Sequence, residues 1–441
     1  MTELSNIPHA LKGLNSVVVH PDFKFPDADV VLSVTGRCLY EKQLLVDTDI
    51  RSNHSESGGA STSDDDEDFH SQTSRDRRKE REEKNNPEKP SQATLFKVHK
   101  SVLRRASEFF ADMFSIPQPS NQDTIDGLPI IYMHDDPIDI HNFINHIYNS
   151  DVLHYLPLRQ STFNMMSSII RLSRKYLLLR LAPAAMFRIR SDWPTTLEEW
   201  DKNDLQVVAI TRWNAQVRDG SQDGGSRLGP EDLLVEPCRV IRFARQENIL
   251  EILPAAFYHL SRLSSLNDPH RPRSCIEGRK RAHGYWMGGG RYATRSVLTP
   301  ADWDTLMIGK AEIRAWFVNF RQYGWQSIHA TNCGADDPSS CVLSSQGGWK
   351  NYWDEVIGVQ TRKILAQDGL DVMEVLQVLR HVVLYDENLC SGCRVQAGKI
   401  VGCARTEFWD CLPDFFRLKR PNPWGGIWME GEPVDCFEQS I

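Results

Sequence analysis

The chain has 441 residues, of which 40% are hydrophobic and 25% are charged, and its formal net charge is −8. At roughly 150 residues per domain, this length predicts two or three domains. The acidic balance speaks against a basic stripe of the kind that binds nucleic acid, and no run reaches the roughly 18 apolar residues of a membrane helix. We therefore expect neither a direct nucleic-acid partner nor a membrane partner.

The N-terminus and the cysteines predict the compartment. Residues 1–20 lack a positively charged stretch followed by an apolar core, so we expect no signal peptide. The ten cysteines are too few for a disulfide scaffold in a chain of this length. We therefore expect the protein in the cytoplasm or nucleus, where paired thiols favour metal or redox use.

The first patterned element in the chain is a strand. Residues 1–21 show little periodicity and are expected to form an N-terminal tail. Residues 25–34 (FPDADVVLSV) are rich in β-branched residues, which favours a strand. After a second, short extended stretch at 95–99, residues 100–114 place their apolar side chains at helical spacing.

A segment of different composition separates these two stretches. Residues 47–94 are dominated by acidic and basic side chains, and Ile50 and Phe69 are their only larger apolar residues. Such a segment cannot bury enough apolar surface to offset the entropy lost on ordering. We therefore predict a disordered acidic insertion within one domain, since its flanks both carry strand-like patterns.

Three residues of this insertion are candidate phosphorylation sites. Ser61, Thr62 and Ser63 each precede an acidic residue by three positions, a spacing that suits an acidophilic kinase. Phosphorylation would add about −1.5 to −2 charges per site and would act on partner choice. The alternative interpretation is a plain solvated acidic tract.

Further elements complete a first domain. Residues 128–133 predict a strand, and Asp136 is placed to cap a helix that has Pro137 at its first position. Helical spacing recurs over residues 163–181, and another helix is expected from residue 182. The elements together predict an α+β domain that ends near residue 190.

The second half of the chain reads as mainly α-helical. A helical C-terminal domain is expected over residues 195–420, followed by a tail at 421–441. Within it, residues 299–302 (TPAD) have the composition of a helix N-terminus. Apolar periodicity predicts two successive helices at 349–366 and 371–384.

Several stretches of the first domain together resemble the BTB/POZ domain. They are FPDADVVL at 25–32, LFKVHKSVLRRASEFFADMF at 95–114, and residues 130–148, and they occur in the order and at the spacing of that family. Residues 165–189 are similar to its closing helices. The match covers residues 22–190 without the insertion, and in detail it is most similar to BTB proteins of basidiomycete fungi.

This resemblance implies a protein–protein interaction module. Two uses compete: a substrate adaptor for a cullin-type ubiquitin ligase, and a transcription- or chromatin-associated scaffold. An enzyme with an unrecognised site is the least favoured alternative, because no nucleophile elbow, zinc-protease motif or phosphate loop occurs. Because no swapped N-terminal element is evident before the first strand, we expect at most a weak homodimer.

Asp29 and His99 are the polar residues most deeply placed in the BTB-like motif. A functional interpretation places both in a binding groove. The structural interpretation is that His99 caps or hydrogen-bonds a helix start and that Asp29 accepts hydrogen bonds from backbone N–H groups, as buried polar groups must. Both interpretations stay open on the sequence alone.

Four cysteines form the candidate metal site. Cys390 and Cys393 have the two-residue spacer that lets both thiolates reach one zinc ion, and Cys333 and Cys341 form a wider pair in a polar loop. Antiparallel packing of helices 349–366 and 371–384 would bring the pairs to the same end. The resemblance implies paired cysteines in these regions. A structural zinc ion is thus the candidate cofactor, with a disulfide or redox pair, or unpaired thiols, as alternatives, and Cys403 and Cys411 are candidate substitutes.

Overall fold

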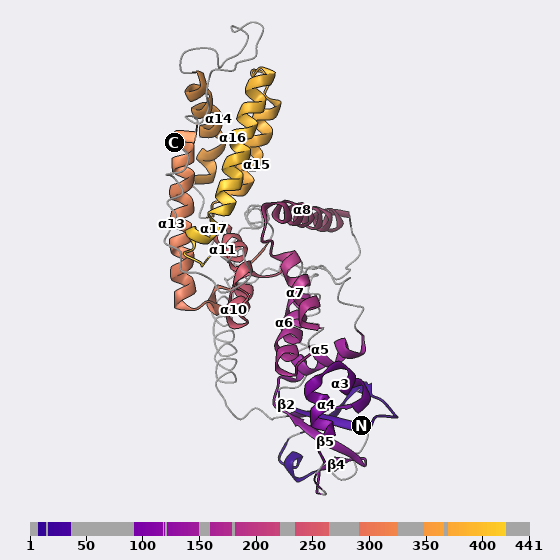
Figure 1. Cartoon of the computed structure of the whole chain (residues 1–441). Coiled ribbons are helices and arrows are strands. Elements are labelled where there is room, and N and C mark those ends of the chain that lie inside the picture. Colours follow the sequence, from indigo (N-terminus) through magenta and orange to yellow (C-terminus); the bar gives the residue numbers. More distant parts are fainter. Residues whose placement is uncertain are drawn as a thin grey trace, which may run out of the picture. The chain divides into compact units, whose positions relative to one another are not determined.

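The protein is described here by a computed structural model, and its chain divides into two compact units of α+β and α-helical structure (Figure 1). Unit 1 comprises Met1–Tyr155 and Met165–Ala185, and unit 2 comprises Leu156–Asn164 and Met186–Ile441. The division thus falls within helices, a few residues before the domain end expected near residue 190. The residues that the structure describes are 8–14, 16–36, 92–117, 119, 121–149, 159–178, 181–220, 234–263, 291–324, 348–365 and 369–419.

Unit 1 contains, among its described residues, a five-stranded sheet in the order β1-β3-β2-β5-β4. The central strand β2 pairs antiparallel with β3 and parallel with β5, so both of its edges are hydrogen-bonded. Strand β1 pairs parallel with β3, and β4 forms a hairpin with β5. The strands are β1 (Ser16–Lys24), β2 (Val30–Gly36), β3 (Gln92–Val98), β4 (Thr124–Ile125) and β5 (Leu128–Met133).

Strand β1 corrects the expectation of an N-terminal tail over residues 1–21. The β-branched run Val17–Val19 pairs with Ala93–Leu95 of β3, and a short 3-10 helix, η1 (His9–Leu11), precedes it. Pro21 is tolerated because β1 is an edge strand of the described sheet. The valine run was the signal for this strand, and its strand propensity outweighed the lack of strict alternation.

Strand β3 also begins earlier than predicted. Residues 92–94, which were assigned to the end of the acidic insertion, pair with β2. Ala93 is fully buried, and 2% of Thr94 is exposed. The pairing partner, not local composition, therefore sets this boundary. The rest of the insertion, with Ser61, Thr62 and Ser63, lies outside the described residues.

The predicted helix at 100–114 is two helices, α3 (Lys100–Ala106) and α4 (Glu108–Ser115). Ser107 between them is extended, with φ −140° and ψ 126°. Its hydroxyl accepts a hydrogen bond from Phe110 N at 3.1 Å and donates one to the Tyr176 carbonyl at 2.5 Å. Because Ser is a good N-cap, it can start a second helix inside a continuous apolar pattern.

The helix predicted from the Asp136–Pro137 pair is confirmed as α5 (Pro137–Tyr148). Asp136 Oδ1 accepts a hydrogen bond from Ile138 N at 2.8 Å. The two closing helices are α6 (Gln160–Lys175) and α7 (Leu181–Asp192), which begin within a few residues of the predicted positions.

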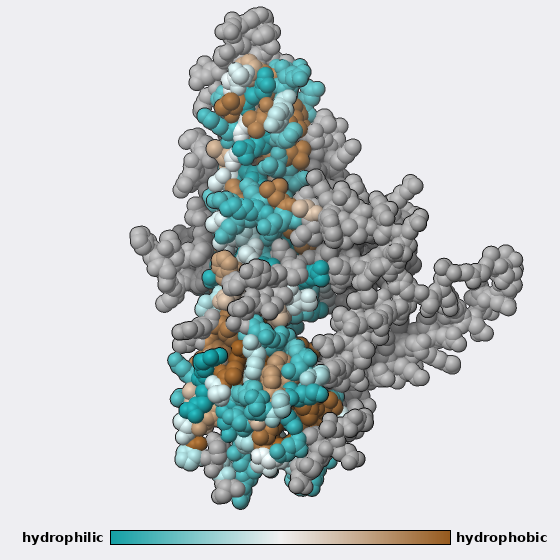
Figure 2. All heavy atoms as spheres, turned by 90° about the vertical axis from the view of Figure 1, so that its right-hand side faces the viewer, coloured by the Kyte–Doolittle hydropathy of each residue, from teal (hydrophilic) through white to brown (hydrophobic). Residues whose placement is uncertain are grey.

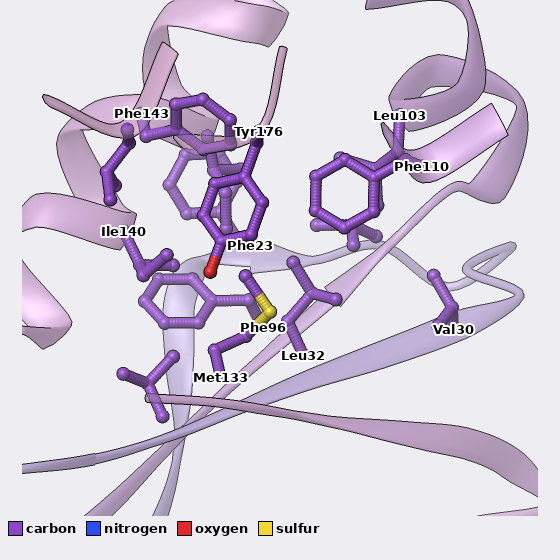
Figure 3. Packing of buried hydrophobic residues seen from close by; sticks show 14 of the residues in the cluster. Phe23, Val30, Leu32, Phe96, Leu103, Phe110, Met133, Ile140, Phe143 and Tyr176 are labelled. Carbon is purple, nitrogen blue, oxygen red and sulfur yellow. The ribbon is translucent and has the colours of Figure 1, made fainter. Parts of the chain in front are cut away.

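The core of unit 1 lies between these helices and one face of the sheet. Figure 3 shows Phe110, Phe143 and Tyr176 packed over that face. The ring centroids of Phe110 and Tyr176 are 5.4 Å apart, and those of Phe143 and Tyr176 are 5.7 Å apart. A second, smaller cluster that includes Leu11, Val31 and Leu95 covers the opposite face.

The described part of unit 2 is helical, as the sequence predicts. The TPAD start is confirmed: Thr299 Oγ1 accepts from Asp302 N at 3.2 Å, and Asp302 Oδ2 lies 3.4 Å from Thr299 N, which completes a capping box. Helices α13 to α16 lie side by side in Figure 1. The helices are α8 (Leu197–Gly220), α10 (Pro237–Gln246), α11 (Leu253–Arg262), α13 (Pro300–Tyr323), α14 (Gly348–Leu365), α15 (Val372–Tyr385), α16 (Ser391–Asp410) and α17 (Leu412–Phe415), with 3-10 turns η3 (Leu250–Ile252) and η6 (Arg295–Val297).

None of the helices in the described ranges is both long enough and apolar enough to cross a membrane.

Candidate functional site

His99 connects the end of β3 to the start of α3. Its backbone N–H donates to Tyr148 Oη at 3.0 Å, and its ring Nδ1 lies 2.9 Å from the same oxygen. Ring Nε2 lies 3.1 Å from Asp27 Oδ1. A carboxylate only accepts, so Nε2 is the donor in its contact with Asp27. This hydrogen bond from His99 lowers the pKa of Asp27 below its usual value.

Asp29 holds the same junction from the other side. Its Oδ1 accepts a hydrogen bond from Lys100 N at 2.6 Å, and its own N–H donates to the Val98 carbonyl at 3.1 Å. It thereby satisfies one of the N–H groups at the start of α3 that have no intrahelical partner. Asp29 makes the contact of the structural interpretation, because it accepts from a backbone N–H at the start of α3. His99 is the N-cap of α3, but its side chain makes no capping hydrogen bond, and both of its ring nitrogens instead contact Tyr148 and Asp27 within unit 1.

An exposed apolar surface lies on the helical side of unit 1. Phe109 and Met113 are spaced to share one face of α4, and Ile116 is the extended residue that follows the helix. Phe109 is 39% exposed and Ile116 is 62% exposed, whereas Met113 is half-buried and packs against the core of unit 1. Leu177, which directly follows Tyr176, is 47% exposed. The Phe109 ring lies 5.3 Å from the ring of Tyr176, the residue before Leu177. We call Phe109, Met113, Ile116 and Leu177 the α4 surface.

Leu177 also has an unusual backbone. Its φ is +52°, in the left-handed region that a bulky side chain rarely adopts. Leu178 N–H donates to the Ser173 carbonyl at 2.8 Å, the bond that closes a helix with a left-handed residue where glycine is usual. The equivalent position after α10 is taken by Asn248, a residue that tolerates this conformation. Unit 1 thus holds an exposed leucine in a conformation that glycine would adopt at lower cost.

The exposed apolar side chains on α15 and α16 are more dispersed. Val378 and Tyr385 on α15 and Val395 on α16 are exposed. Figure 2, seen from the side on which α15 lies in Figure 1, shows small apolar patches divided by polar atoms over these upper helices. Singly scattered apolar side chains are ordinary on protein surfaces.

The interior of unit 2 contains a buried ion pair. Arg262 of α11 is 4% exposed, and its Nε lies 3.1 Å from Asp371 Oδ2. Asp371 also caps α15 by accepting from Glu374 N at 3.2 Å, and it accepts from Tyr258 Oη at 3.0 Å. Tyr258 Oη in turn accepts from Met373 N at 2.9 Å. The pair therefore fixes the start of α15 against α11.

A second buried group surrounds His259. Its ring centroid lies 4.6 Å from that of Trp200 and 5.5 Å from that of Trp193. Neither ring nitrogen of His259 has a hydrogen-bond partner among the described groups. The guanidinium of Arg291, which is fully buried, lies 4.7 Å from the Trp193 ring centre and donates to the Val235 carbonyl at 2.8 Å.

Burial sets the protonation of this group. It lowers the pKa of His259 well below 6.5, and the nearby cations Arg291 and Arg262 lower it further. Burial also raises the pKa of the nearby Asp192 carboxyl to about 6, against the opposing effect of Arg188. His259 is therefore neutral in the folded protein. With 3% of His259 exposed, this group is part of the interior of unit 2.

The predicted cysteine site is described in part. Cys390 is the N-cap of α16, and Cys393 is buried one turn later, whereas Cys333 and Cys341 lie outside the described residues. The described residues contain no group of three or more potential metal ligands. Tyr352 Oη donates to Asp386 Oδ2 at 2.7 Å, so the N-terminal part of α14 lies against the end of α15, as antiparallel packing requires.

The two substitute cysteines do not fit a site at Cys390 and Cys393. All four residues belong to α16 or its caps, and a helix rises about 1.5 Å per residue. Cys403 therefore lies about 15 Å along the axis from Cys393, and Cys411 lies farther away. Thiolates that share a zinc ion each bind at about 2.3 Å, so neither can join that site.

Zinc remains a prediction that metal analysis decides. We expect purified protein to contain about one zinc ion per chain, and Cys393→Ser to remove it, because a tetrahedral structural site needs all four ligands. Cys403→Ser, an exposed position, is the matched control and is expected to keep the metal. Well under half a zinc per chain, with freely titrating thiols, would end the proposal.

Sequence reasoning missed the polar groups inside unit 2. Asp371 precedes an apolar-periodic helix, so its capping role had a local signal. Its pairing with Arg262 had none, because the two residues are far apart in the chain. For His259 and Arg291 no signal distinguished a buried position from a surface one.

Comparisons with protein-family models, with curated proteins and with solved structures find no match to this chain.

Proposed function

We propose that the chain is a non-enzymatic protein–protein interaction adaptor whose unit 1 is a BTB/POZ-like domain. Three observations support the domain assignment. The FPDADVVL stretch leads into β2, the FKVHK stretch runs from β3 into α3, and Asp29 and His99 hold that junction. The α+β architecture of unit 1 agrees with the resemblance.

The observation that carries the function is the α4 surface. Its exposed apolar side chains are Phe109 of α4, Ile116 just after α4 and Leu177 just after α6, and Phe109 contacts Tyr176, which precedes Leu177. Apolar side chains that cluster on a surface mark protein interaction sites more often than scattered ones do. Aromatic anchors such as Phe109 supply much of the binding energy at such sites.

Leu177→Gly separates the folding role of this surface from its binding role. A left-handed conformation costs an L-residue roughly 1–2 kcal/mol, and glycine avoids this cost. The unfolded chain is more flexible at a glycine, so ordering it on folding costs roughly 0.5–1 kcal/mol more. We expect the variant to gain about 0.5–1 kcal/mol, seen as slower amide hydrogen exchange at the end of α6. A faster exchange there would show that the leucine side chain stabilises the fold.

The partner is tested by affinity purification and mass spectrometry from a fungal lysate. We expect the full chain to recover cullin subunits, and Leu177→Gly and Phe109→Asp to lose them. Phe187→Asp, at a position 69% exposed in unit 2, is the matched control and is expected to keep them. A purified cullin subunit then tests direct binding.

The other outcomes of this experiment separate the alternatives. Recovery of chromatin proteins in place of cullin would favour the scaffold. Equal recovery by all three variants would contradict a role for the α4 surface. Turnover of a metabolite by the pure protein would reinstate an enzyme.

A further inference from the structure

A small pocket opens on unit 2 between α11, α13 and the residue pair before α15. Its cavity is about 180 Å³, and its lining residues are Ser261, Met307, Lys310, Ile313, Arg314 and Leu370. Ile313 and Leu370 are buried and form an apolar floor, whereas 59% of Met307 is exposed. The cationic side chains of Lys310 and Arg314 thus lie beside this apolar floor.

The pocket lies on a longer stripe of α13. Trp303, Met307, Lys310, Arg314 and Val318 are spaced to share one face of the helix, and all five are at least partly exposed. The exposed acidic residues of α13, Asp304 and Glu312, fall outside that stripe on the helix. A mixed apolar and basic face is thus built into a chain whose net charge is −8.

The pocket walls are held in place before any ligand arrives. A Cβ added at Gly369 would lie 2.1 Å from the Arg262 carbonyl oxygen, so only glycine lets the chain pass this close to α11. This close passage positions Leu370, and the next residue is Asp371, the partner of Arg262. On the other wall, Ser261 Oγ donates to the Tyr258 carbonyl at 2.8 Å. Such preorganisation favours binding, because few side chains or backbone segments of the pocket must be ordered when a ligand binds.

We propose that this pocket binds a short acidic segment of a partner protein, with one apolar side chain in the depression and carboxylates against Lys310 and Arg314. The volume favours a single side chain, since pockets for drug-sized ligands measure roughly 300–1,000 Å³. The charge favours carboxylates, which pair with arginine in a planar, two-bonded geometry. The site extends the proposed adaptor function by giving unit 2 a partner site of its own.

The test uses the full chain and a fluorescein-labelled peptide in which a central Leu-Phe pair is flanked on each side by three aspartates. We expect binding by fluorescence anisotropy, weakened at least tenfold by Arg314→Glu and severalfold by Met307→Ala. Arg380→Glu, an exposed arginine on α15, is the charge-matched control and is expected to bind as the unchanged protein does. A peptide with two alanines at its centre is expected to bind at least tenfold more weakly.

Several outcomes would overturn the proposal. They are equal binding of the two peptides, equal effects of Arg314→Glu and Arg380→Glu, and no binding to the unchanged protein. Leu177→Gly distinguishes this site from the α4 surface, because it is expected to leave peptide affinity unchanged. Loss of cullin recovery with retained peptide binding, or the reverse, would show which of the two proposals fails.

Discussion

Replacing Asp371 with asparagine is expected to lower the free energy of unfolding of unit 2 by about 3–5 kcal/mol, the usual cost of removing one partner from a buried ion pair. Asparagine caps helices about as well as aspartate and has the same shape, so the start of α15 is retained. What is lost is the carboxylate that contacts Arg262, whose side chain is 2% exposed and which also interacts with Asp204 and Glu374. Urea unfolding followed by tryptophan fluorescence measures the effect.

The tryptophans make this readout specific. All 12 lie at residue 193 or later, within unit 2. Asp304→Asn, an exposed position on α13, is the matched control and is expected to change stability by less than about 0.5 kcal/mol. Adding Arg262→Met to Asp371→Asn should restore part of the loss, because the buried cation that lost its contacting carboxylate is then gone. Equal stability of Asp371→Asn and Asp304→Asn would contradict the ion-pair account.

Local chemistry predicted many of the helices and strands well. Two helix starts could be predicted because capping depends on residues only a few positions apart. They are those at Asp136 with Pro137 and at Thr299 with Asp302. Asp126-Gly127 is a further local signal, because an Asp-Gly pair favours a tight hairpin turn. These two residues form the turn between β4 and β5, with φ values of +51° and +76°. Ser107, also a capping residue, divides a helix that apolar spacing alone had joined.

Features that depend on distant contacts were beyond the sequence. The start of β3 at Gln92 is set by its pairing with β2, across an insertion whose composition hides it. The α4 surface becomes visible only when Phe109 packs against Tyr176, the chain neighbour of Leu177. Likewise, nothing near Arg262 in the sequence indicates that it is buried or that its counter-ion is Asp371. Long-range packing, not propensity, decides each of these.

Replacing His259 with phenylalanine is expected to flatten the pH dependence of unit 2 stability. The folded protein keeps His259 neutral because burial lowers its pKa, whereas the unfolded chain takes up a proton below about pH 6.5. The unfolded state therefore binds more protons as the pH falls. Through this group the unchanged protein should lose up to about 1.4 kcal/mol of stability per pH unit below about pH 6.5.

Phenylalanine keeps the aromatic packing between Trp193 and Trp200 and removes two buried ring nitrogens without partners. We therefore expect His259→Phe to be at least as stable as the unchanged protein at about pH 7.5, and its relative advantage to grow as the pH falls to about 5. Asp192 has a raised folded pKa, about 6, and so favours folding as the pH falls below that value. Because it is present in both proteins, its contribution cancels in their difference. Urea unfolding by tryptophan fluorescence across this range gives that difference, and parallel stability curves for the two proteins would show that His259 is not held neutral.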